Sequence, residues 1–166
     1  RNEQIIDFVR AVSPAIYRIF MRLIKLEIPD IDHFIHNSRE ASYDRWKFER
    51  MRESDYTVLQ LFHAESTVNS SSLTELILHL DLPESVKEEV RQLRELEKSV
   101  RNPLAHLIKP FDEAELYRTT GFSSQHFMEI LVDLARFTGI VYDRDHFYFD
   151  EANRLVRALL TGEENG

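Results

Sequence analysis

Apolar residues recur at alternating intervals of four and three along the first 26 residues, and this spacing constrains the fold more than any other feature. The stripe consists of Ile5, Val9, Val12, Ile16, Ile19, Leu23 and Leu26. Such alternation is typical of a long helix in a bundle or coiled coil, and it predicts a helix over residues 3–26. The apolar residues that widen the stripe are Ile6, Phe8, Phe20 and Ile24. Within it, Ser13-Pro14 predicts a kink or a restart, with Ser13 as N-cap and Pro14 at the first helical position.

The composition agrees with a helical fold. Only 4 Gly and 5 Pro occur among 166 residues, which disfavours a many-turned β-sandwich or barrel. With no Cys, a disulfide framework, a thiolate zinc site and a Cys nucleophile are excluded. No apolar run has the length of a membrane span, so we expect no membrane partner and a cytoplasmic protein. The net charge of −8 means that any nucleic-acid binding must come from a local basic patch.

Cap and turn residues divide the remainder of the chain into further elements. Helices are predicted over residues 40–63, 72–80, 83–100, from 112–115 onward, 124–138 and 150–160. Ser72-Leu73-Thr74-Glu75 has the spacing of a capping box, Asp112 to Glu115 repeats it, and Gly139 follows the helix that Ser123 or Ser124 begins. Residues 140–149 are typical of a short hairpin, because the turn Asp143-Arg144-Asp145 separates Ile140-Val141-Tyr142 from His146-Phe147-Tyr148-Phe149. The predicted fold class is therefore mainly α, a helical bundle with a small C-terminal β-hairpin.

The segment Arg101-Asn102-Pro103-Leu104-Ala105-His106 is the strongest candidate for chemistry. On a helical wheel Asn102 and His106 project together, opposite the apolar stripe of this segment. Pro103 disfavours helical backbone at Asn102, so we predict a break, with Asn102 as N-cap and Pro103 opening the next helix. Free amides at such a helix start favour an anion. Arg101, Asn102 and His106 would then form a phosphate site.

Basic residues share one flank of the predicted 83–100 helix, which leads to this segment. The buried stripe of that helix is predicted to be Val86, Val90, Leu93, Leu96 and Val100, and its basic flank is Lys87, Arg91, Arg94, Lys98 and Arg101. Such a track fits a nucleic-acid backbone, and the candidate RNA-binding residues are Arg94, Lys98 and Lys109. The flank also fits a solvated helix face, because acidic residues stand three or four positions away. The ion pairs predicted on that basis are Glu88–Arg91, Glu95–Lys98 and Glu97–Arg101.

The segment from Arg101 to His106 resembles the Arg-x4-6-His signature of HEPN ribonucleases, whose polar residue after the Arg is matched by Asn102. Residues 86–140 resemble in particular the ancillary ribonucleases of type III CRISPR systems, which cyclic oligoadenylate switches on. The resemblance implies a HEPN domain spanning residues 1–166 that works as a homodimer. Because the chain begins at Arg1 and has no glycine-rich βαβ pattern, we expect a fragment of a longer protein. Cyclic oligoadenylate is expected to act only through the N-terminal sensor domain, which is absent here.

The residue types fit cleavage of single-stranded RNA without a metal or cofactor. The 2′-OH attacks the adjacent phosphorus, which requires a proton acceptor, a proton donor and a cation for the phosphorane. The unperturbed pKa of a histidine side chain lies near neutrality, which suits His106 to proton transfer, and Arg101 offers a planar fork to phosphate oxygens. Asn102 is expected to orient the phosphate or to hold His106. One protomer supplies one such His, and a two-fold dimer supplies two.

Two other functions remain open on the sequence. The chain also fits a non-catalytic HEPN-like interaction or RNA-binding module, and it fits a HEPN toxin paired with an antitoxin. A metal site at His33 and His36 is disfavoured, because the sequence fixes no third ligand.

Overall fold

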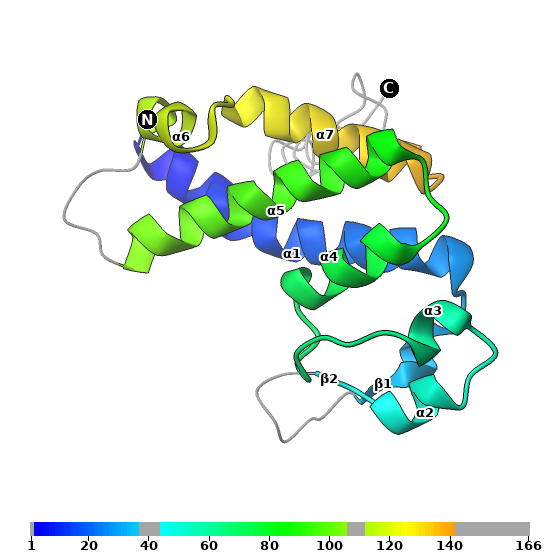
Figure 1. Cartoon of the computed structure of the whole chain (residues 1–166). Coiled ribbons are helices and arrows are strands. Elements are labelled where there is room, and N and C mark those ends of the chain that lie inside the picture. Colours follow the sequence, from blue (N-terminus) through cyan, green and yellow to red (C-terminus); the bar gives the residue numbers. More distant parts are fainter. Residues whose placement is uncertain (1, 37–43, 106–111, 142–166) are drawn as a thin grey trace, which may run out of the picture.

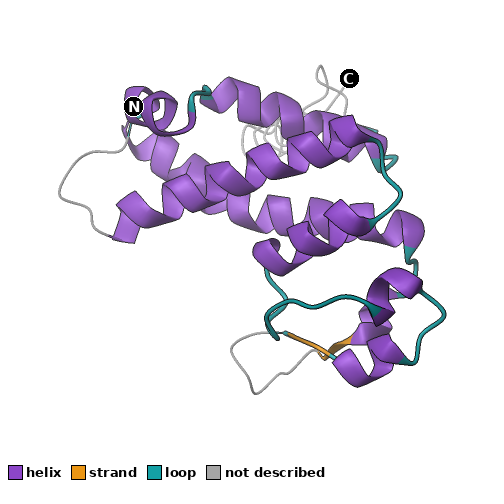
Figure 2. Cartoon of the chain, viewed as in Figure 1, coloured by secondary structure: helices purple, strands orange, loops and turns teal. Residues whose placement is uncertain are grey.

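The computed structural model describes residues 2–36, 44–105 and 112–141, and for residues 2–11 and 100–105 it describes the backbone only. Helices dominate these residues, which confirms the mainly α fold (Figures 1 and 2). The helices are α1 (Asn2–Glu27), η1 (a 3-10 helix, Ile31–Phe34), α2 (Phe48–Arg52), α3 (Thr57–Gln60), α4 (Ser70–His79), α5 (Glu84–Ala105), α6 (Glu113–Thr120) and α7 (Ser124–Phe137). The predicted hairpin and last helix fall largely or wholly on residues 142–166, outside the described residues.

The long first helix is confirmed, and it runs without a restart through Pro14. Pro14 lacks the N–H that would bond to the carbonyl of Arg10. Its ring is exposed, whereas Val12 and Ile16 on either side are buried. Packing of the apolar stripe therefore outweighs one lost hydrogen bond, and the predicted restart is wrong. The stripe is buried as predicted from Val12 to Leu23, but Leu26 is exposed.

Helices α1 and α5 form the centre of the bundle. Helix α1 packs against α4, α5 and α7, while α5 also packs against α4, α6 and α7 (Figure 1). The predicted buried stripe of α5 is confirmed at Val86, Val90, Leu93 and Leu96, each with at most 5% of its surface exposed. Burial of these branched side chains stabilises the fold by about 1.5–3 kcal/mol each.

The helical region predicted over residues 40–63 holds only two short helices in its described part, residues 44–63, which belongs to a small subdomain at one end of the bundle. Strands β1 (Ile35–His36) and β2 (Arg45–Trp46) pair antiparallel, and the backbone of Ser66 accepts a hydrogen bond from Trp46 at 2.9 Å. The short helices α2 and α3 follow (Figure 2). Trp46 packs edge-on against Phe62, with ring centroids 5.5 Å apart. Pairing with distant residues therefore holds Arg45 and Trp46 extended.

The helix starts show which residues cap them. Helix α4 begins earlier than predicted, because the Asn69 side chain accepts from the amides of Ser71 and Ser72 at 2.8 and 3.0 Å. Ser72 is the third helical residue of this capping box, not its N-cap. The caps predicted at Asp112 and Ser123 are confirmed. Gly139 after α7 has φ 82°, the left-handed conformation expected of a residue that ends a helix.

Candidate active site

The predicted break at Asn102 is wrong, because α5 (Glu84–Ala105) continues through both Asn102 and Pro103. Asn102 is therefore not an N-cap, and Pro103 does not open a helix. Pro103 removes one helical hydrogen bond, that to the carbonyl of Ser99, while the buried stripe holds the preceding turns in place. Arg101, Asn102 and Pro103 thus belong to α5.

This position changes the electrostatics of the candidate site. Inside a helix the backbone amides bond to carbonyls one turn earlier, so residues 101–105 lack the free amides that the predicted helix start would have offered to an anion. A phosphate near Arg101 must therefore be held by side chains. The side chains of Arg101 and Asn102, and all of His106 and Lys109, lie outside the part of the chain whose side chains the structure describes. Their roles remain predictions.

The basic flank of α5 is paired with carboxylates along much of its length. Arg91 contacts Glu84 at 2.8 Å and Glu88 at 3.1 Å, and hydrogen bonds to these two carboxylates raise the pKa of its guanidinium. Lys98 lies 3.6 Å from Glu95, and both side chains are more than half exposed. Two of the predicted ion pairs are therefore confirmed. Exposed pairs of this kind contribute about 0–1 kcal/mol each to the free energy of unfolding, so little stability is lost when Lys98 leaves Glu95 to contact another anion.

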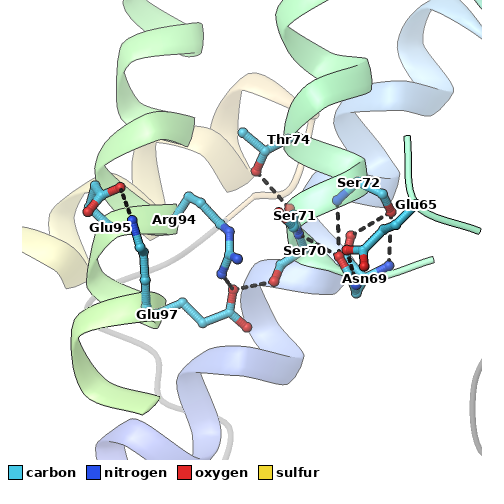
Figure 3. Close-up of polar contacts among 10 residues, drawn as sticks. Glu65, Asn69, Ser70, Ser71, Ser72, Thr74, Arg94, Glu95 and Glu97 are labelled. Atoms are coloured by element: carbon cyan, nitrogen blue, oxygen red, sulfur yellow. Dashed lines mark hydrogen bonds and ion pairs between the residues drawn. The ribbon is translucent and has the colours of Figure 1, made fainter. Parts of the chain in front are cut away.

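Arg94 differs from its neighbours, because its partner is buried. Its Nη1 lies 3.0 Å from Oε2 of Glu97, a side chain that is only 6% exposed. The Ser70 hydroxyl of α4 donates to the same oxygen, and the Thr74 hydroxyl donates to the Ser70 carbonyl at 2.7 Å (Figure 3). A buried carboxylate must be paired, so Arg94 has a structural partner that the sequence did not identify. Its contact with RNA remains a prediction.

A second feature that sequence reasoning missed is His126 on α7. Its ring stacks on Phe122, with centroids 4.5 Å apart and planes 15° apart, and its Nε2 lies 3.0 Å from Oε1 of Gln92 on α5. The contact joins residues 34 positions apart, so no local spacing signals it. His126 therefore links α7 to α5, the helix in which the motif begins.

The described residues contain neither a metal-binding cluster nor a membrane-spanning helix. In that part of the chain no three His, Asp or Glu side chains gather as metal ligands. His33 is 79% exposed and lies 3.9 Å from Asp30, as an ordinary surface pair would. Among the described helices, none has the length and apolar character needed to cross a membrane.

Comparison with known families identifies the family to which this helical bundle belongs. The model of the Cas_Csm6 HEPN domain family matches residues 1–157. The chain belongs to this HEPN family. No curated protein matches the sequence.

Membership of the Csm6 HEPN family confirms the resemblance that the Arg101–His106 segment carries, and the match extends well beyond residues 86–140. It places the chain among CRISPR-associated HEPN domains, which are generally ribonucleases. The helical bundle agrees with this family. Within this bundle, the motif of the chain begins in α5, one turn after the buried Glu97.

Proposed function

We propose that the chain is a metal-independent endoribonuclease that cleaves single-stranded RNA in type III CRISPR defence. The observation that carries the proposal is the family match over residues 1–157, which includes the whole Arg-x4-His segment. The long α5, packed on α1, α4, α6 and α7, gives the start of that segment a rigid support. The residue types of the segment supply the chemistry.

In the proposed reaction the 2′-oxygen attacks phosphorus while the bond from phosphorus to the 5′-oxygen breaks. One His106 accepts the 2′-OH proton, and a second donor protonates the departing 5′-oxygen. Arg101 stabilises the charge that develops on the non-bridging oxygens. The products are an RNA end with a 2′,3′-cyclic phosphate and another with a 5′-OH.

A homodimer supplies the two proton-transfer groups. Each protomer carries one motif, so we propose that two protomers meet with their motifs face to face across a two-fold axis. Phe20 takes no part in such an interface, because it is completely buried within the protomer.

We extend the proposal to the regulation and the location of the enzyme. We assign any control by cyclic oligoadenylate to a sensor domain distinct from the HEPN domain of residues 1–157. The proposed macromolecular partners are single-stranded RNA and a second copy of the chain. The protein acts in the cytoplasm, where the transcripts of an invading element are made.

The test is cleavage of a fluorescent single-stranded RNA in EDTA by the wild type and by His106→Ala. The wild type should release products with cyclic-phosphate and 5′-OH ends, and an all-DNA strand should stay intact. His106→Ala should be inactive with unchanged thermal stability. His33→Ala is the matched control, because His33 is a highly exposed histidine, and it should cleave normally. RNA binding without cleavage would favour the non-catalytic module, and cleavage of DNA would refute the 2′-OH mechanism.

A further inference from the structure

Glu97 is a buried carboxylate close to the motif that the proposed reaction does not use. Its side chain is 6% exposed, and both of its described hydrogen-bond donors, Ser70 and Arg94, bind one oxygen, Oε2. The other oxygen, Oε1, has no partner among the residues whose side chains the structure describes. Figure 3 shows this arrangement between α4 and α5.

The helical register places Arg101 next to Glu97. The two residues stand four positions apart in α5, which turns by about 100° per residue, so their positions are about 40° apart around the axis. Residues four apart on a helix are surface neighbours, and an acidic residue before a basic one is the favourable order. Arg94 lies one turn earlier on this same face. Glu97 thus stands between a described cation and the motif Arg.

Glu97 is also held by a residue of a second helix, Ser70 of α4. In the described part of the chain, the Ser70 bond is the only side-chain hydrogen bond that joins α4 to α5. Ser70 is itself 6% exposed, and it lies in the first turn of α4, which the Asn69 cap fixes. A carboxylate held by two donors from two helices has little freedom to rotate, and this is the property needed in a group that orients another.

We propose that Glu97 is the positioning residue of Arg101, and that its free oxygen orients the Arg101 guanidinium toward the scissile phosphate. This inference rests on the proposed function, in which Arg101 contacts that phosphate. A guanidinium has five donors in a planar fork, so it can bind a carboxylate on one edge and a phosphate on the other. Ser70 and Arg94 act one step further away, by holding Glu97.

The test is a double-mutant cycle between Glu97→Gln and Arg101→Ala, measured as the affinity for an RNA that carries a 2′-deoxy nucleotide at the scissile position. Such an RNA binds without being cut, so the measurement does not depend on catalysis. Glutamine keeps the size of Glu97 and an oxygen that can still accept from Ser70 and Arg94. Glu95→Gln is the matched control, because Glu95 stands on the same helix and forms a mostly exposed pair.

We expect Glu97→Gln to weaken binding about three- to tenfold and Glu95→Gln to change it less than twofold. The double variant should bind as weakly as Arg101→Ala alone, because Glu97 acts through Arg101. Single-turnover cleavage of the all-RNA strand should follow the same pattern. If Glu97→Gln fails to fold, Ser70→Ala takes its place in the cycle, with a smaller effect of the same non-additive kind.

Two results would overturn the role of Glu97: wild-type affinity in Glu97→Gln, or a double variant weakened by the product of the two single effects. The second result would show that Glu97 supports the fold independently of Arg101. Failure of the proposed enzyme looks different, because the wild type would then bind the RNA, show the non-additive cycle and leave the all-RNA strand uncut. A wild type that binds no RNA would overturn both proposals.

Discussion

Replacement of Arg94 by alanine distinguishes a structural cation from an RNA-binding one. The substitution leaves the carboxylate of Glu97, which is 6% exposed, with Ser70 as its remaining described donor. Breaking a fully buried ion pair costs about 3–5 kcal/mol, and a hydrogen bond to a charged group is worth about 1.5–3 kcal/mol. Arg94 is 23% exposed, which places its pair at the lower end of these ranges. We expect Arg94→Ala to lower the free energy of unfolding by about 2 kcal/mol.

Thermal unfolding by circular dichroism measures this loss. For a domain of this size, about 2 kcal/mol corresponds to a drop in Tm of roughly 4–8 °C. Lys98→Ala is the matched comparison, because Lys98 lies one turn away with 62% of its side chain exposed. Its removal should change stability by less than about 0.5 kcal/mol.

The salt dependence of RNA binding gives a second test that distinguishes Arg94 from Lys98. A lysine that neutralises one phosphate of single-stranded RNA contributes about 0.7 to the slope of log affinity against log salt. We expect Lys98→Ala to reduce that slope by about this amount and Arg94→Ala, measured well below its Tm, to leave it unchanged. A stable Arg94→Ala protein with a reduced slope would refute the structural assignment of Arg94.

Three further predictions follow from other parts of the structure. Burial, and then the charge of Asp133, raise the pKa of Glu89, so its ionised form destabilises the fold as the pH rises above the ordinary value of 4.5. Glu89→Gln should therefore raise Tm by about 1–2 °C at pH 7 and show a smaller gain near pH 4. Asn69→Ala removes the cap of α4 and should cost about 1–2 kcal/mol in urea denaturation, and no loss would contradict the capping role. Mixing Arg101→Ala with His106→Ala protomers should restore little RNA cleavage if both motifs form one composite site, whereas a fully active monomer in light scattering would exclude that site.

Local signals predicted the helices well where a cap or a stripe acts within a few residues. The caps at Asp112 and Ser123 and the buried face of α5 are of this kind. The prediction of a helical region over residues 40–63 failed because the backbone there bonds to partners elsewhere in the chain, such as Ser66, which accepts from Trp46. The helix breaks predicted at the two prolines were wrong for another reason. Pro14 and Pro103 predict breaks locally, but long buried stripes keep α1 and α5 continuous.

The partner of Glu97 shows why the site was predicted only in outline. Sequence spacing allows Glu97 to pair with Arg94 three residues before it or with Arg101 four residues after it, and the order of the charges favours Arg101. Ser70, 27 residues earlier, fixes one carboxylate oxygen, and that same oxygen receives Arg94. Only the packing of α4 on α5 brings Ser70 there, so no local rule could assign the pair.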